Sequence, residues 1–175
     1  MSTILSYKIH TVTPYINWIY FFHAWGFQPR YAAIANIHGC DACRAMWLAS
    51  FPVEERNKAS EAMQLFKEAN RMLDVLDRDY EVRTIFKLCK ANSDGDNLVI
   101  EKAENQFMVF PLLRQQTPKK DGSPFLCLSD FIRPLSSGIP DTLGAFASSI
   151  DADMEGLYEQ DPYKHLLVQT LSDRL

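Results

Sequence analysis

The sequence predicts an α+β protein in which helices pack against an antiparallel sheet and both terminal segments are helical. Helical patterns fill about the first 76 residues, strand-like segments follow, and a helical pattern returns toward residue 175. This segregation favours an antiparallel sheet, because a doubly wound parallel sheet needs helices and strands to alternate. The length of 175 residues and the hydrophobic fraction of 47% suit one compact domain with a sizeable core. We therefore expect a single domain over residues 1–175.

The first helix is predicted by a start signal, an apolar run and a stop signal. Thr13 can cap a free backbone N–H, and Pro14 at the first helical position has no N–H to leave unpaired. Residues 15–25 are apolar on nearly every face, and Gly26 predicts the end of the helix. A helix of this kind needs cover on most sides. We expect it to lie in the core.

Two further helices are predicted before the strands. Residues 39–49 form a short helical segment that Phe51-Pro52 ends. Residues 53–76 carry apolar side chains three and four positions apart, with charged side chains between them, which is typical of a long amphipathic helix. The repeating apolar positions are Ala59, Met63, Phe66, Ala69, Leu73 and Leu76.

Five segments rich in β-branched and aromatic residues predict strands. They are residues 80–90, 98–102, 105–111, 125–128 and 142–149. Residues 92–97 consist of Asn, Ser, Asp and Gly and predict a hairpin turn between the first two strands. Residues 119–124 predict a polar loop.

The C-terminal segment predicts a final helix. Asp161-Pro162 repeats the cap-then-proline start signal, and the apolar pattern of the helix still runs at Leu175. Two interpretations stay open: the helix frays at the chain end, or a longer architecture stops here partway through a helix.

Charge and composition exclude several classes of partner. The chain has 18 Lys and Arg against 22 Asp and Glu, which gives a net charge of −4. It therefore lacks the positive electrostatic field that would attract the phosphate backbone of nucleic acid. The N-terminus lacks a signal-peptide pattern, and the most apolar stretch, residues 16–27, is shorter than the ~20 residues that cross a bilayer. Four cysteines are too few for a disulfide scaffold. We expect a cytoplasmic protein with reduced thiols and no membrane partner.

Two motifs carry candidate chemistry. Cys40 and Cys43 form a Cys-x-x-Cys pair, which can bind a soft metal or cycle through a disulfide. A structural zinc site normally has a second close-spaced pair, whereas Cys89 and Cys127 lie far apart. Ordinary small buried side chains are the favoured interpretation, and a metal or redox site is the alternative. The triplet at residues 114–116 is interpreted as solvated surface.

Six segments in chain order resemble one known family. Residues 13–18 (TPYINW) resemble the T-P-[FY]-I-D-W opening of the reactivation domain of cobalamin-dependent methionine synthase, and residues 65–74 resemble its L-F-x-D-A-x-x-M-L-D helix. Four more segments resemble the family's P-A-N-x-x-G-D-D, L-R-Q-Q, C-L-A-D-F and S-G-x-x-D-Y-I-G-A-F-A patterns. They are residues 90–97, 113–116, 127–131 and 137–147. The resemblance covers nearly the whole chain and the N-terminal portion of the family domain.

The resemblance implies a role in rescuing cobalt. In the family, reactive Co(I) occasionally oxidises to inert Co(II), and the reactivation domain binds S-adenosylmethionine and covers the cobalamin-binding module. A reduced flavodoxin-type donor supplies the electron, and the methyl group of S-adenosylmethionine traps the reduced cobalt. In the family, the protein mainly positions the cobalamin and the S-adenosylmethionine. Cobalamin would therefore reach this chain only through a partner, and no catalytic residue of its own is expected.

Departures from the family pattern limit which functional residues of the family can be assigned to this sequence. The family Asp that contacts S-adenosylmethionine is Asn17 here, which can still hydrogen-bond but has lost its charge. The family's main binding run, R-P-x-x-G-Y-P-x-x-P, does not occur in this sequence. Residues 39–50, with Cys40 and Cys43, are predicted to be an insertion relative to the family.

Three functions are compatible with the residues. The preferred one is a stand-alone, truncated activation-domain protein that supports reductive methylation of cobalamin in methionine biosynthesis. The second is a non-catalytic relative that keeps the scaffold for protein interaction and no longer binds S-adenosylmethionine. The third is a metal or redox protein that uses Cys40 and Cys43.

Overall fold

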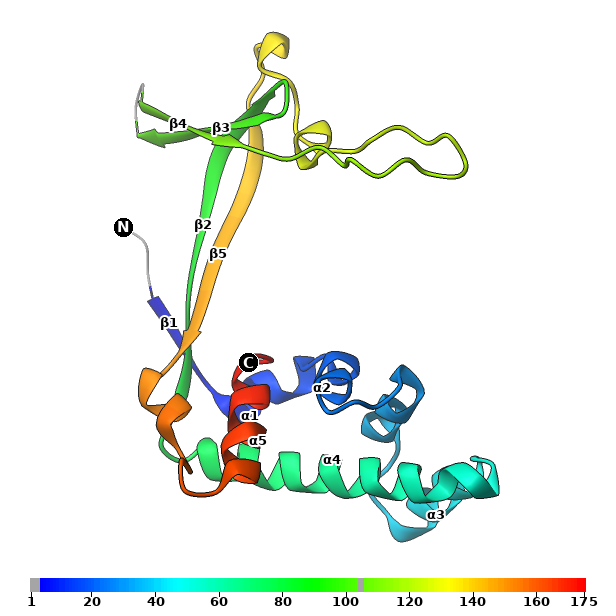
Figure 1. Ribbon diagram of the computed structural model, residues 1–175. Helices are drawn as coiled ribbons and strands as arrows, with labels where there is room; N and C mark the ends of the chain where they lie inside the picture. The colour runs from blue at the N-terminus through cyan, green and yellow to red at the C-terminus, as the bar shows by residue number, and fades with distance from the viewer. Residues whose placement is uncertain (1–3, 104–105) are drawn as a thin grey trace. The chain divides into compact units, whose positions relative to one another are not determined.

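The computed structural model describes residues 4–103 and 106–175, with only the backbone at residue 155 (Figure 1). Five strands form one sheet in the order β1-β2-β3-β4, and β5 also pairs with β2. The β2–β3 and β3–β4 pairs are antiparallel. The strands are β1 (Ile4–Lys8), β2 (Glu81–Asp94), β3 (Asn97–Ala103), β4 (Gln106–Pro111) and β5 (Asp141–Ile150). The predicted α+β class is confirmed.

The chain divides into two compact units, and the division falls within β2 and β5. A helical unit contains residues 5–84 and 148–175, and a β unit contains Ile4 and residues 85–147. The single domain predicted over residues 1–175 stays a prediction. Among the described residues, no helix combines the length and the apolar character that crossing a bilayer requires.

Five α-helices and several 3-10 turns build the described part of the helical unit. The α-helices are α1 (Ile9–Val12), α2 (Trp18–Ala24), α3 (Asp41–Ala49), α4 (Arg56–Leu76) and α5 (Pro162–Ser172). The 3-10 turns are η1 (Thr13–Tyr15), η2 (Pro29–Asn36), η3 (Val53–Glu55) and η6 (Ala152–Gly156). The predicted helices at 39–49 and 53–76 and the helix that starts at Asp161-Pro162 are all present.

The start of α2 differs from the prediction. Thr13 and Pro14 lie in the 3-10 turn η1, and the backbone then becomes extended at Ile16 before α2 begins. The cap of α2 is Asn17, whose Oδ1 accepts a hydrogen bond of 3.2 Å from the backbone N–H of Ile19. The cap-then-proline signal therefore marks a short turn here, because the chain bends again before it becomes helical.

The predicted stop of α2 at Gly26 is confirmed. Gly26 has a φ of +73°, and its N–H donates to the carbonyl oxygen of His23 at 3.0 Å. The N–H of Phe27 donates to the carbonyl oxygen of Phe22 at 2.9 Å, which completes a Schellman motif. The expected burial of this helix on most sides is wrong. Phe22 is fully buried, but Tyr20 is 58% exposed.

The hydrophobic core lies in the helical unit around α4. This helix buries one face, and α2 and α5 pack into the same core. The fully buried positions include Ile9, Phe21, Phe22, Ala59, Ala62, Ala69, Met154, Val168 and Leu171. Trp25 Nε1 donates to Thr170 Oγ1 at 3.1 Å, which links the end of α2 to α5.

The hairpin turn in the β unit is shorter than predicted. Asp94 pairs with Asn97, so only two residues form the turn, and Gly95 has the positive φ of +58° that such a turn needs. Asn92 belongs to β2, because it pairs with Val99 of β3, and its Nδ2 donates to the carbonyl oxygens of Arg133 and Ile139 at 3.1 and 2.9 Å. The pairing with β3 extends β2 to Asp94, beyond the predicted strand end at residue 90.

The other predictions for the β unit have mixed outcomes. The strands at 106–111 and 141–150 and the loop at 119–124 are present, whereas residue 105 lies outside the described residues. The strand predicted at 125–128 is wrong. The chain there is irregular and then enters a 3-10 turn, η4 (Leu128–Phe131).

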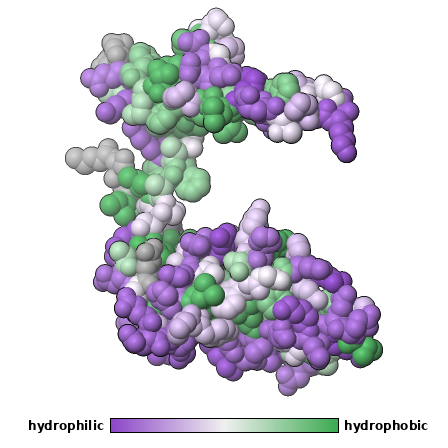
Figure 2. Space-filling model, viewed as in Figure 1, coloured by the Kyte–Doolittle hydropathy of each residue, from purple (hydrophilic) through white to green (hydrophobic). Residues whose placement is uncertain are grey.

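Large apolar side chains lie on the surface of the β unit. Figure 2 shows hydrophobic residues gathered on the viewed face of β3 and β4. The side chains that are at least half exposed are Ile4, Phe86, Leu88, Phe107, Val109, Leu113, Leu128, Phe131, Leu135, Ile139 and Phe146. Among the described residues of this unit, only Ala91, Cys127 and Ser129 are fully buried. The β unit therefore leaves most of its apolar surface uncovered by this chain.

Candidate functional site

A groove in the helical unit contains Asn17. It has a volume of about 490 Å³ and lies between η2 and the segment that leads into α2. Its lining residues are Tyr15, Ile16, Asn17, Trp18, Ile19, Pro29, Arg30, Ala32, Ala33, Ala35 and Asn36. The extended backbone at Ile16 and the two flanking turns bring these side chains together.

The groove is nearly uncharged. Among its described lining residues, Arg30 is the only one with a charge, and its Nη1 lies 3.0 Å from Glu55 Oε2. Asn17 is exposed, and the capping bond to Ile19 occupies its Oδ1. The Asn17 amide group can donate to a ligand through Nδ2, but the groove offers no carboxylate to a cationic ligand.

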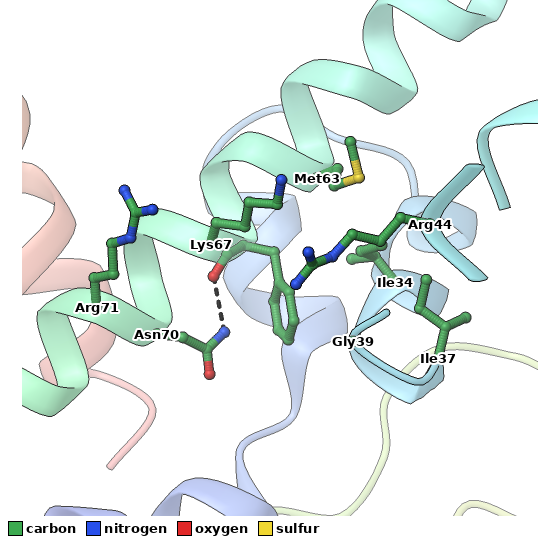
Figure 3. Close-up of a pocket in the computed structure, with 9 residues that line it drawn as sticks. Ile34, Ile37, Gly39, Arg44, Met63, Lys67, Asn70 and Arg71 are labelled. Atoms are coloured by element: carbon green, nitrogen blue, oxygen red, sulfur yellow. Dashed lines mark hydrogen bonds between the residues drawn. The ribbon is translucent and has the colours of Figure 1, made fainter. Parts of the chain in front are cut away.

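A second pocket is basic, and the sequence did not point to it. Figure 3 shows this pocket of about 340 Å³, with Lys67 and Arg71 on α4 and Arg44 on α3. Its apolar lining comes from Ile34, Ile37, Met63 and Phe66. The four-residue spacing of Lys67 and Arg71 places both cations on one face of α4. This spacing is the feature of the sequence that could have indicated the basic pocket. The pocket suits a ligand that combines an anionic group with an apolar part.

The two cysteines of the Cys-x-x-Cys pair lie beside His38. The ligand atoms of His38, Cys40 and Cys43 are all within 4.8 Å of one another. Cys40 is the cap of α3, and its Sγ accepts from the backbone N–H of Cys43 at 3.4 Å. Both cysteines are half-buried and free, and His38 is exposed. They are therefore not the buried small side chains that the sequence favoured.

The surroundings of Cys40 favour its thiolate form. A hydrogen bond from the His38 side chain and the backbone N–H of Cys43 lower the pKa of Cys40 from 9.0 to about 7. The hydrogen bond between the two thiols and partial burial raise the pKa of Cys43. The sequence analysis did not include His38 in this candidate site. The position of His38, two residues before Cys40, could have indicated it.

Arg114 organises the β unit. Its guanidinium donates to Asp96 Oδ1 and, in a bidentate pair, to both carboxylate oxygens of Asp130, at distances between 2.7 and 3.0 Å. It also donates to the carbonyl oxygen of Phe125 at 2.7 Å. These contacts join three of the segments that resemble the family. Gln115 and Gln116 are exposed, as predicted, whereas Arg114 is half-buried and has a structural role.

Paired charges shift the titration of this cluster. The Arg114 side chain and the backbone N–H of Cys127 lower the pKa of Asp130 from 3.8 to about 2. The two carboxylates raise the pKa of Arg114. These hydrogen bonds link segments of the β unit that are far apart in the sequence, which gives the cluster a structural role.

Comparisons with known proteins agree with the fold and the motifs. The family described as "Vitamin B12 dependent methionine synthase, activation domain" matches residues 8–175. A crystal structure of the MetH reactivation domain bound to AdoHcy superposes with a TM-score of 0.72 at 31% sequence identity. The match covers 99% of this chain and 51% of that chain, so this chain spans about half the length of its structural relative. This chain therefore belongs to the activation-domain family of vitamin B12 dependent methionine synthases.

Proposed function

We propose that this chain supports the reductive methylation of cobalamin in methionine biosynthesis, as a shortened activation-domain protein that works with a methionine synthase. The observation that carries the proposal is the family match over residues 8–175, together with the fold shared with a reactivation domain. Cobalamin would be reached only through the cobalamin-binding module of the partner. The chain would act in the cytoplasm and contribute positioning, with no catalytic residue of its own.

The Asn17 groove is the proposed contact with S-adenosylmethionine. The solved relative was bound to AdoHcy, which supports a related ligand here. The volume of about 490 Å³ is within the range of small-molecule sites, and Asn17 Nδ2 can donate a hydrogen bond. The charge fit is poor, because a sulfonium and an α-amino cation favour a carboxylate and the described lining of the groove has none. We therefore expect weak binding by this chain alone.

The exposed apolar surface of the β unit supports a protein partner. An apolar surface of this extent is unfavourable in water and typically marks an interaction site. The chain spans 51% of its structural relative, so the other half of that domain is the occupant we propose for this surface. Polypeptide from that half would also bring the binding groups for S-adenosylmethionine that this sequence lacks.

Association with these partners can be measured directly. The full chain would be mixed with the remaining half of a methionine synthase activation domain, and separately with a cobalamin-binding module. Size-exclusion chromatography and calorimetry would report complex formation. We expect a stable complex with the complementary half, and binding of the cobalamin module once that complex has formed. If neither partner associates with the chain, the proposal is wrong.

The second candidate function is that of a scaffold without S-adenosylmethionine binding. The neutral Asn17 groove favours it, since the charge that would hold a cationic ligand is missing. The two functions differ in one observable. A scaffold binds the cobalamin module equally well with and without S-adenosylmethionine, whereas an activation-domain protein binds it more tightly when the ligand is present. A reduced flavodoxin-type electron donor is a partner of the first function only.

A further inference from the structure

We propose that His38, Cys40 and Cys43 form a binding site for Zn²⁺, independent of the cobalamin role. Their ligand atoms, one imidazole nitrogen and two sulfurs, all lie within 4.8 Å of one another. In a tetrahedral zinc site, Zn–S bonds of about 2.3 Å and Zn–N bonds of about 2.0 Å place neighbouring ligand atoms about 3.5–4 Å apart. Small side-chain rotations are enough to close that difference around an ion.

The backbone brings the two sulfurs together before any ion binds. Cys40 caps α3 and Cys43 lies in its first turn, so both side chains gather at the N-terminal end of a nine-residue helix. The backbone N–H of Cys43 already donates to Cys40 Sγ at 3.4 Å. Amide N–H groups near a ligand sulfur stabilise its thiolate and orient it toward a metal. The backbone at Cys40 is extended, and the residues before it place His38 beside the two sulfurs.

The donor set matches zinc in chemistry and charge. Thiolate and imidazole ligands together select borderline-soft ions such as Zn²⁺ over Mg²⁺ or Ca²⁺, which prefer oxygen. Two thiolates and a neutral imidazole balance the two positive charges of the ion. The nearby Arg44 lies 3.4 Å from Asp41, so its charge is partly compensated by a carboxylate outside the cluster.

The exposure of the site indicates three protein ligands and one open position. His38 is exposed and both cysteines are half-buried, so solvent reaches the ion. A water molecule or another small donor would complete the tetrahedron, as in zinc sites with three protein ligands. A dithiol–disulfide pair would use the same contact between His38 and Cys40 to hold the thiolate. Thiol oxidation is therefore the competing outcome of the test.

The test uses Co²⁺ as a spectroscopic probe for zinc. The reduced full chain, freed of metal with a chelator, is titrated with Co²⁺ and then with Zn²⁺. We expect one Co²⁺ per chain, a thiolate-to-cobalt charge-transfer band, strong visible bands typical of tetrahedral cobalt, and loss of all bands when Zn²⁺ is added. Cys40→Ser and Cys43→Ser should each weaken Co²⁺ binding at least tenfold and reduce the charge-transfer band. His38→Ala should weaken binding at least tenfold.

Cys89 provides a matched control. It is also a free, half-buried cysteine but lies on β2, outside the cluster. Cys89→Ser should leave Co²⁺ binding unchanged. If a variant fails to fold, alkylation of the native chain gives the same answer, because bound Zn²⁺ should protect Cys40 and Cys43 and leave Cys89 reactive. The proposal is overturned if the reduced chain gives no charge-transfer band, if zinc gives no protection, or if the cysteines only form a disulfide.

Discussion

Asn17 has a structural task that does not depend on any ligand. Its Oδ1 accepts the N–H of Ile19 and caps α2, and a carboxylate at this position would do the same. An Asn in place of the family Asp therefore keeps the cap and loses only the charge. A substitution between Asn and Asp at position 17 therefore changes the charge offered to a ligand and leaves the helix cap in place.

Asn17→Asp should strengthen the binding of S-adenosylmethionine. A charge-assisted hydrogen bond contributes about 1.5–3 kcal/mol against about 0.5–1.5 kcal/mol for a neutral one, so a gain of about 1 kcal/mol is expected. That corresponds to a roughly fivefold lower Kd in calorimetry. Asn17→Ala is the control that removes the cap, and it should destabilise the fold by about 1 kcal/mol without tightening binding. An Asn17→Asp variant with unchanged affinity would show that the groove is not the binding site.

Asp130 makes the stability of the β unit depend on pH. Its folded-state pKa of about 2 is below the ordinary value of 3.8, so its contribution is complete above about pH 4 and is lost as the pH falls toward 2. Urea unfolding between pH 5 and pH 2 should therefore show a steeper loss of stability in the wild-type chain than in Asp130→Asn. Arg114→Ala should reduce this pH dependence and leave the part that comes from the backbone N–H of Cys127, whereas Gln116→Ala should keep it unchanged. Parallel curves for the wild type and Asp130→Asn would contradict this assignment.

At the scale of elements, α2 has one buried face and one exposed face. Phe22 is fully buried and packs edge-to-face on Phe21 and Phe27, with ring centroids 5.6 Å apart in each pair. Ile19, on the same helix, is 46% exposed. The helix therefore depends on its buried aromatic residues for its place in the core.

Phe22→Ala should destabilise the helical unit far more than Ile19→Ala. Removal of a buried Phe side chain loses transfer free energy and leaves a cavity, at a cost of about 3–5 kcal/mol. Ile19→Ala removes a half-exposed side chain and should cost less than about 1 kcal/mol. Urea unfolding monitored by circular dichroism measures both changes. Equal losses in the two variants would mean that this part of the core is described incorrectly.

Local patterns predicted the elements that local interactions determine. The helices α3, α4 and α5 and the hairpin with β3 followed from spacing, caps and turn residues. The strand predicted at 125–128 failed because Arg114 and Gln115 hold that segment, through hydrogen bonds to Phe125 and Leu126, in an irregular path. Side chains distant in sequence determine such a segment, so its conformation could not be read from its own residues.

The candidate sites show the same limit. The sequence identified Asn17 by resemblance and Cys40 with Cys43 by spacing, and these residues remain predicted sites. The basic pocket depends on how residues 34–44 pack against α4, whereas the approach of His38 to the two cysteines depends on the backbone at the start of α3. Periodicity within one element carries no information about such packing between elements.

At the scale of the whole molecule, the two units differ in how well they bury their apolar residues. The helical unit has a closed core, whereas the β unit exposes Phe107, Leu113 and Phe146 to 63%, 94% and 77%. Burial of apolar surface is the main favourable term in association. The β unit is therefore the part of this chain that would gain most from a partner.

Phe146→Asp should weaken association with the complementary half of the domain at least tenfold. The substitution places a charge on an exposed position of β5, where it costs little in the free chain and becomes an unpaired charge in a covered interface. Val53→Asp is the matched control, because Val53 is 73% exposed but belongs to the helical unit. Calorimetric titration of both variants measures the effect. Equal affinities for the two variants would place the partner on another surface.

The most direct test of the proposed function is cobalamin rescue itself. A methionine synthase without its own activation domain would be held in the Co(II) state with S-adenosylmethionine, a reduced flavodoxin-type donor and the complementary half of the domain. The visible absorbance of the corrin would be followed with and without this chain. The proposed function predicts that methylcobalamin forms only when the chain is added. A corrin spectrum that stays the same in its presence and its absence would contradict it.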